Sequence, residues 1–107
     1  MEIRQYLIIL VNLDTTIGSE IKKTRPCVVI SPDEMNKYLR TVIIAPVTTD
    51  SENYPTRAKI KYNNKIGWVV LDQITSIDRQ RIIKELGKLS GSEVKKIRAI
   101  IKEAFVD

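Results

Sequence analysis

The chain is divided into short apolar runs, and this feature most restricts what it can fold into. Each run has the length of a strand and is bounded by polar or turn-forming residues. The runs are Tyr6–Asn12, Cys27–Ser31, Thr41–Val47, Arg57–Tyr62 and Gly67–Asp72. Short strands separated by long polar loops predict a mainly β chain, folded as a strongly bent sheet or a small barrel.

Residues 57–62, RAKIKY, show the clearest strand pattern, because apolar and basic side chains alternate. Ala58, Ile60 and Tyr62 would face the core, and the other face would be entirely basic. That basic face either guides a nucleic-acid backbone or is simply solvated, and the sequence leaves both readings open. The Asn63-Asn64 pair that follows predicts a turn. Residues 73–77 could continue the strand Gly67–Asp72 after a bend.

Two helices are expected. Ser31-Pro32-Asp33-Glu34 resembles a helix start with Ser31 as the N-cap, which predicts a short helix over Asp33–Leu39. Ser90–Phe105 has an apolar face, and Ser90 and Glu93 have the spacing of a capping box, which predicts a helix that closes the chain. Residues 82–89 fit either a short helix or a strand, with strand favoured.

The composition restricts the chemistry. A chain of 107 residues with 43% hydrophobic side chains is expected to form one domain over 1–107 and to need no disulfide or cofactor. Its single cysteine, Cys27, lies in an apolar run, which indicates a small buried side chain rather than a nucleophile. The chain has no histidine, the commonest general base and zinc ligand. The carboxylates are scattered, so no metal is expected. A magnesium site stays open as an alternative at the strand ends and loops that carry Asp14, Glu20, Asp50 and Asp72.

Length and charge indicate a location and a class of partner. No apolar run approaches the ~20 residues that span a membrane, and no cleavage site follows the N-terminal apolar run, so the expected location is the cytoplasm, without a membrane partner. Residues 1–53 carry a net charge of −1 and residues 54–107 a net charge of +6. A basic half favours a polyanion such as RNA or DNA, although a lysine-rich solvated helix gives the same charge.

Residues 22–31, KKTRPCVVIS, place a cation next to a rigid proline. Arg25 would lie on a loop at the start of a strand, a position suited to a functional cation, although this stretch alone favours a solvated basic loop. Polar residues also follow the third strand, at Thr48–Ser51, and the fifth, at Asp72-Gln73. If the strands form one barrel, these groups could meet at one rim. Guanidinium and hydroxyl donors there would suit a phosphodiester.

The chain resembles the MazF/PemK family of bacterial toxin endoribonucleases in three segments. They are VNLDTTIGSEIKKTRPCVVISPDEMN at 11–36, IIAPVTTDSENYPTRAKI at 43–60 and VVLDQITSIDRQRIIKELGKLS at 69–90, in the family order and spacing. Thr15 replaces the usual proline, and Arg4-Gln5 replaces the usual Gly-Asp before the first strand. Both departures concern loop geometry.

The resemblance implies a small SH3-like barrel with added helices, acting as a homodimer. It implies sequence-specific cleavage of single-stranded RNA without a metal, and inhibition by a small acidic antitoxin. The family's catalytic arginine and threonine match Arg25 and Thr48, and Asp72 matches an acidic position used by some relatives. Arg25 would stabilise the phosphorane charge rather than act as a base, because guanidinium stays protonated. The general base is not identified.

Base recognition would come from the loops, because single-stranded RNA is read by stacking and by hydrogen bonds to splayed bases. Tyr54 is as readily a half-buried loop anchor, and mid-strand Trp68 is interpreted as core or dimer interface. The candidate RNA-binding residues are Glu20, Lys22, Lys23, Thr49, Asn53, Tyr54, Asp72 and Gln73.

Two other functions stay open. One is a toxin of the same fold that binds a protein such as DNA gyrase, which would cut no RNA. The other is a non-catalytic RNA-binding module, which would bind RNA in a salt-sensitive way and release no products.

Overall fold

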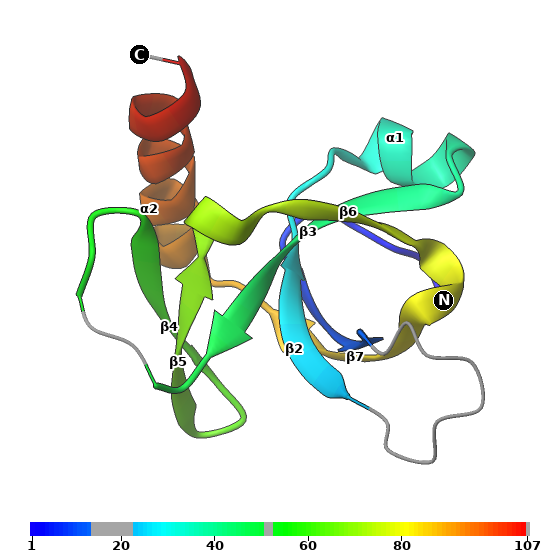
Figure 1. Ribbon diagram of the computed structural model, residues 1–107, viewed down its shortest axis with the longest axis horizontal. Coiled ribbons are helices and arrows are strands. Elements are labelled where there is room, and N and C mark those ends of the chain that lie inside the picture. Colours follow the sequence, from blue (N-terminus) through cyan, green and yellow to red (C-terminus); the bar gives the residue numbers. More distant parts are fainter. Residues whose placement is uncertain (14–22, 51–52, 107) are drawn as a thin grey trace.

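The computed structural model describes residues 1–13, 23–50 and 53–106, and it is a strongly bent sheet with two helices (Figure 1). The strands are β1 (Leu7–Asn12), β2 (Thr24–Val29), β3 (Thr41–Thr48), β4 (Arg57–Tyr62), β5 (Lys65–Val70), β6 (Thr75–Asp78) and β7 (Ile82–Lys88). The helices are α1 (Asp33–Tyr38) and α2 (Gly91–Ile101), with short helical turns η1 (Leu71–Gln73), η2 (Arg79–Arg81) and η3 (Lys102–Val106). The mainly β prediction is confirmed, including both helices and a strand within residues 82–89.

Strand β3 is the centre of the sheet, whose order is β4-β5-β3-β2-β1-β7 with β6 also paired to β3. β3 pairs with β2 as far as Pro46, which faces Cys27, and with β5 from Val47 onward. Pro46 therefore lies inside β3, two residues before its end. Its missing N–H falls where β3 changes neighbours, so no continuous ladder needs that donor.

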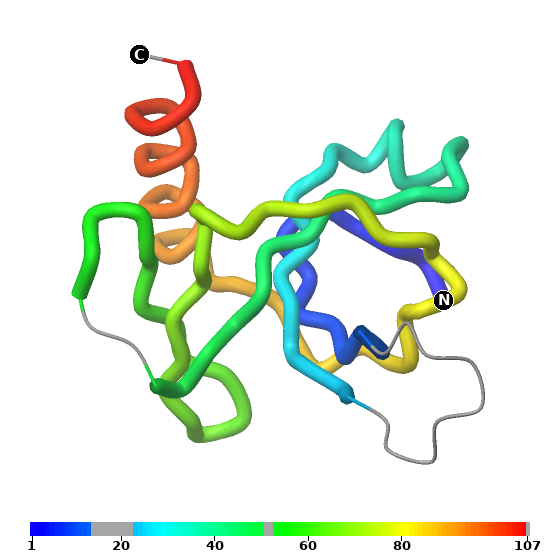
Figure 2. The backbone as a smooth tube through the Cα atoms, in the orientation of Figure 1, coloured from blue at the N-terminus to red at the C-terminus, as the bar shows by residue number. Residues whose placement is uncertain are grey.

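This change of partner divides the molecule into two lobes (Figure 2). In one lobe the backbone of β1, β2, β6 and β7 curls into a ring, and in the other β4 and β5 lie beside α2 (Figure 1). Two buried clusters match the lobes. Val28 and Ile97 belong to the cluster under α2, and Cys27 and Val29 belong to the cluster inside the ring. Because alternate side chains of Cys27–Val29 enter different clusters, both faces of this half of β2 are covered, as its apolar sequence requires.

The predicted turn and the predicted N-terminal cap of α2 both form, and each depends on neighbouring residues. Asn63 and Asn64 both have left-handed φ, 48° and 59°, which matches a type I′ hairpin between β4 and β5. The Ser90 amide donates to Glu93 Oε1 over 2.8 Å, and the Glu93 amide donates to Ser90 Oγ over 3.3 Å, so the capping box is confirmed. The second oxygen of Glu93 accepts the backbone N–H of Lys61 over 2.7 Å, which ties α2 to β4.

The first helix begins at Asp33 as predicted, but the prediction of Ser31 as its N-cap is wrong. Pro32 occupies the N-cap position of α1 without a side-chain hydrogen bond, and Ser31 lies outside the helix, 2% exposed. The Ser31 hydroxyl donates to the side-chain oxygen of buried Asn36 and accepts the Ile43 N–H over 3.1 Å. Burial of the Asn36 amide explains the difference, because a buried polar group needs a partner and the nearest hydroxyl supplies it.

Candidate RNA-cleavage site

Arg25 lies within β2, opposite Val11 of β1, and its side chain is exposed. The prediction that it lies on a loop before the strand is wrong, because β2 begins at Thr24. Pro26 fits inside the strand because its fixed φ is compatible with extended backbone, and because the ladder between β2 and β3 starts only at Cys27. A strand holds Arg25 more rigidly than a loop would.

The strand register brings Arg25 and Thr48 to the same end of β2 and β3. Cys27 faces Pro46 in the last paired position, and Arg25 and Thr48 lie two residues beyond it on their strands. Residues two apart share a face of the sheet, so both side chains project from the same face. Beyond this point β3 turns to β5, and the two strand ends separate (Figure 1). The two predicted catalytic residues therefore flank the place where the sheet opens.

The surroundings of this pair are polar and accessible. The Asp50 amide donates to Thr48 Oγ1 over 3.2 Å, which fixes the first turn after β3, and Thr49 is exposed. On the other side, the Leu13 amide donates to the Lys23 carbonyl over 2.8 Å. A depression of about 310 Å³ lies against Arg25 and is lined by Leu13, Lys23, Thr24 and Arg25. Glu20 and Lys22 lie outside the described residues.

Thr48 begins a row of residues across the second lobe. It faces Trp68 of β5, which in turn faces Lys59 of β4. Thr48 and Trp68 are partly exposed and Lys59 is exposed, whereas Val47 and Val69 on the opposite face are buried. The row Thr48–Trp68–Lys59 therefore lies on the outer face of the β3–β5–β4 sheet, on the face from which Arg25 also projects.

Asp72 and Gln73 do not join this end of the sheet. β5 runs antiparallel to β3, so from Trp68, opposite Thr48, it leads away toward the other end of β3. Asp72 lies in η1, four residues further along the chain and beyond the end of β5. The strand direction therefore separates Asp72 and Gln73 from Thr48 within one chain, and their contact with RNA stays a prediction. Residues 73–77 do not continue β5 either, because β6 pairs with β3.

Tyr54 lies at that distant end in a network with Asp72. The Arg57 guanidinium stacks 4.9 Å from the centre of the Tyr54 ring, and its Nε lies 3.6 Å from Asp72 Oδ1. Thr56 Oγ1 donates to the same carboxylate oxygen over 3.0 Å. These contacts anchor the loop before β4 to η1, which agrees with the reading of Tyr54 as a loop anchor; its ring is 47% exposed. Asn53, beside it in sequence, is exposed.

Cys27 is close to Arg25 in sequence but inert. Its side chain is fully buried, and this burial raises the pKa of the thiol from its ordinary value of 9.0 to about 12, although the nearby Arg25 charge acts in the opposite direction. A thiol with this pKa carries almost no thiolate at neutral pH, so it cannot act as a nucleophile. The prediction of a buried cysteine is confirmed.

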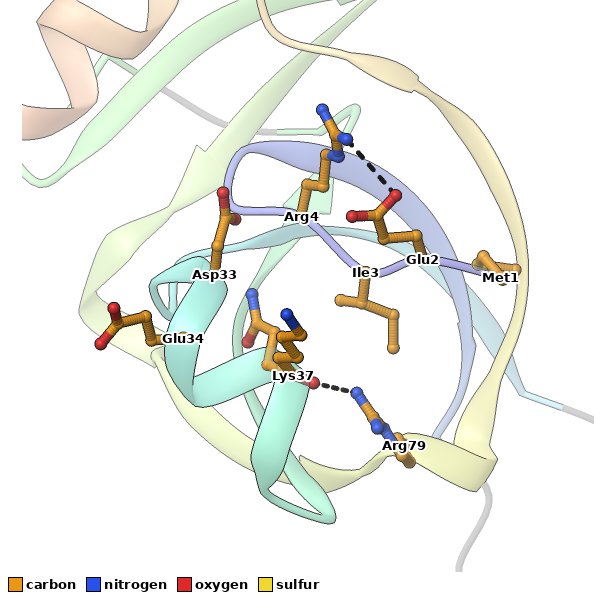
Figure 3. Close-up of a pocket in the computed structure, with 9 residues that line it drawn as sticks. Met1, Glu2, Ile3, Arg4, Asp33, Glu34, Lys37 and Arg79 are labelled. Carbon is orange, nitrogen blue, oxygen red and sulfur yellow. Dashed lines mark hydrogen bonds and ion pairs between the residues drawn. The ribbon is translucent and has the colours of Figure 1, made fainter.

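A separate pocket of about 460 Å³ lies between the N-terminal segment, α1 and η2 (Figure 3). Its lining carries charges of both signs, and the Arg79 side chain donates to the Asn36 carbonyl at its edge. It lies beyond the end of β2 opposite to Arg25, and none of the predicted site residues that the structure describes lines it. The lining residues are Met1, Glu2, Ile3, Arg4, Asp33, Glu34, Asn36, Lys37 and Arg79.

The described part of the chain offers neither a metal cluster nor a membrane-spanning helix. Residues 1–13, 23–50 and 53–106 contain no cluster of three or more histidine, cysteine, aspartate or glutamate residues that could hold a metal ion. Asp14 and Glu20, two of the four carboxylates considered for magnesium, lie outside these ranges. Within the same ranges, no helix has the length and apolar character needed to cross a membrane.

Comparisons with known proteins agree with this geometry. The family model described as PemK-like, MazF-like toxin of type II toxin-antitoxin system matches residues 4–105. An endoribonuclease MazF from Staphylococcus saprophyticus is 35% identical over 98 residues, which cover 86% of this chain and 82% of that protein.

Solved structures support the fold. MazF from Deinococcus radiodurans superposes with a TM-score of 0.79 at 22% identity, covering 96% of both chains. A MazE-MazF structure from the same organism gives a TM-score of 0.81 at 21% identity, covering 96% of this chain and 95% of that one. The Mycobacterium tuberculosis toxin MazF-mt6 gives 0.78 at 22% identity, covering 92% and 95%. The chain belongs to the PemK-like, MazF-like family of type II toxin-antitoxin toxins.

Proposed function

We propose that this protein is a sequence-specific, metal-independent endoribonuclease that cuts single-stranded RNA, and that it acts as the toxin of a toxin-antitoxin pair. The observation that carries the proposal is the register of β2 and β3, which puts Arg25 and Thr48 on one face at the opening of the sheet. The S. saprophyticus relative, named an endoribonuclease, supports the same activity.

The proposed reaction is attack of a ribose 2′-OH on the adjacent phosphorus. A 2′-O–P bond forms, the P–O5′ bond breaks, and the 5′-oxygen takes up a proton, leaving a cyclic phosphate and a 5′-OH end. Arg25 stabilises the charge that builds up on the phosphorane oxygens, and its guanidinium fork can contact two of them. Thr48 offers a hydroxyl that orients the 2′-OH or binds a phosphate oxygen. The group that removes the 2′-proton is left unassigned.

The experiment is incubation of the purified protein with a long unstructured RNA in EDTA, followed by sequencing of the new 5′ ends. We expect cuts at one short sequence, and a loss of at least about 100-fold in rate for Arg25→Ala. Arg40→Ala is the matched control, because this arginine is also exposed but lies in the turn after α1. Equal rates for Arg25→Ala and the parent would refute the site. Binding of intact RNA without products would favour the non-catalytic module.

The proposed partners follow from the same family membership. We propose a homodimer and an acidic antitoxin, since a chain with net charge +5 complements an acidic partner, and we propose that the protein acts in the cytoplasm. Sedimentation equilibrium tests the dimer, which would have twice the 12.3 kDa mass of one chain. A monomer at every concentration that supports cleavage would refute it.

A further inference from the structure

Trp68 stands out because a large aromatic side chain lies beside a proposed catalytic residue on an outer sheet face. It is the only tryptophan in the chain. Its strand neighbours Val69 and Val70 are 0% and 3% exposed, and Gly67 is buried, whereas Trp68 is only partly buried. Its position opposite Thr48 excludes the interpretation of Trp68 as a core residue, because the core face of β5 at this level is formed by Val69.

The register defines the neighbours of the indole. In antiparallel strands, directly opposed residues have Cβ atoms about 5 Å apart and share a face. Trp68 therefore has Thr48 on one side and Lys59 on the other. Two residues further along the hairpin, the same face continues with exposed Lys61, opposite Ile66, which is 53% exposed. An aromatic side chain thus lies between the Thr48 hydroxyl and two lysines.

This arrangement matches what single-stranded nucleic acid requires. Bases stack on aromatic rings independently of sequence, and neighbouring cations bind the backbone. We propose that Trp68 is the stacking platform for a nucleobase next to the scissile phosphate, with Lys59 and Lys61 binding the adjoining backbone phosphates. The inference rests on the proposed endoribonuclease function, and it adds a binding residue to the pair Arg25 and Thr48.

The single tryptophan makes the test direct, because all indole fluorescence reports on this site. The ligand is a 2′-O-methyl octamer carrying the sequence found by mapping the cuts, or random octamers if no cuts occur. Such RNA has no free 2′-OH and stays intact. We expect the parent's fluorescence to be quenched by about half or more at saturation. Trp68→Ala should weaken binding, measured by anisotropy, about 5- to 100-fold, whereas Trp68→Phe should keep most of the affinity.

Control variants and kinetic measurements distinguish a loss of base stacking from misfolding and from loss of the dimer. Tyr38→Ala is the matched variant, because Tyr38 is 76% exposed at the end of α1, beyond the far end of β2, and its affinity should equal the parent's. In cleavage assays, Trp68→Ala should raise KM at least about fivefold with kcat changed less than about threefold, because stacking contributes similarly in ground and transition states. A merely structural loss would lower kcat as well.

The outcomes distinguish the two proposals. Quenching without cleavage would refute the nuclease and keep Trp68 as an RNA-binding residue. Cleavage by the parent with unchanged fluorescence, or parent affinity in Trp68→Ala, would overturn the stacking role and keep the nuclease. An indole shielded from acrylamide in the free protein, with Trp68→Ala dissociating the dimer, would place Trp68 in the subunit interface and also overturn it.

Discussion

At the scale of single residues, the hydroxyl of Thr48 can be tested separately from the shape of its side chain. This hydroxyl accepts the Asp50 amide over 3.2 Å, and in the proposed reaction it orients the 2′-OH or binds a phosphate oxygen. Thr48→Val keeps the shape and removes the hydroxyl, so we expect cleavage to fall about 10- to 100-fold. Thr48→Ser keeps the hydroxyl and should retain activity within about fivefold. Initial rates on a short RNA carrying one cut site measure both, and equally slow Val and Ser variants would argue against a role for the hydroxyl.

Cys27 makes a pH prediction. Its thiol titrates near 9.0 in the unfolded chain, and burial raises its pKa to about 12 in the folded protein. Below pH 9 both states hold the proton, so the stability contribution is complete there. Above pH 9 only the unfolded chain releases it, so the free energy of unfolding falls by up to about 1.4 kcal/mol per pH unit. Urea unfolding of the parent and of Cys27→Ala measures the difference, which should shrink by roughly 2 kcal/mol between pH 9 and about pH 10.5. A constant difference would contradict the assignment.

At the scale of elements, the packing of β5 against β3 depends on Gly67. A Cβ at this position would lie 2.7 Å from Val47 Cγ1 and 3.3 Å from Tyr62 Cε1. We therefore expect Gly67→Ala to cost about 1–3 kcal/mol of stability. Gly91→Ala is the control, because a Cβ there meets nothing within 4 Å, and it should be neutral or slightly stabilising at the start of α2. Chemical denaturation measures both variants.

The same steric clash provides a second test. If overlap with Val47 is the cause, Val47→Ala should partly relieve Gly67→Ala, so the double variant loses less stability than the two single variants together. Strictly additive losses would show that the Val47 side chain does not set the cost, which leaves the contact with Tyr62 as the cause.

Elements were predictable where the signal is local. The Ser90–Glu93 box and the Asn63-Asn64 turn form as their sequences indicate, because each is decided by neighbouring residues. The N-cap prediction fails at Ser31 because its partner, Asn36, is buried by contacts that sequence spacing does not reveal. The candidate site shows the same limit. The family motif predicts Arg25 and Thr48, whereas the place of Trp68 beside Thr48, and the separation of Asp72 from it, depend on strand register and direction.

At the scale of the whole molecule, the two sides of the β4–β5 hairpin differ in charge and in what packs against them. α2 packs on the core side, where Ile97 meets the cluster that includes Ala58, and the outer side carries Lys59 and Lys61. We expect Lys59→Gln with Lys61→Gln to lower the slope of log Kd for RNA against log salt by about 1–2. Lys95→Gln with Lys96→Gln, on exposed positions of α2, should leave it unchanged. Equal slopes for all three proteins would show that the hairpin does not contact RNA.

The contact between Glu93 and the Lys61 amide has a consequence for how the protein behaves in a crowded solution. β4 is the last strand at one end of the sheet, and the unpaired amides of such a strand can template pairing with another molecule. The Glu93 carboxylate accepts one of these amides, that of Lys61. The exposed side chains of Lys59 and Lys61 on the same strand would repel a second strand of the same sequence. One side chain therefore both starts a helix and protects the sheet from growing into an aggregate, so loss of Glu93 would reduce solubility as well as stability.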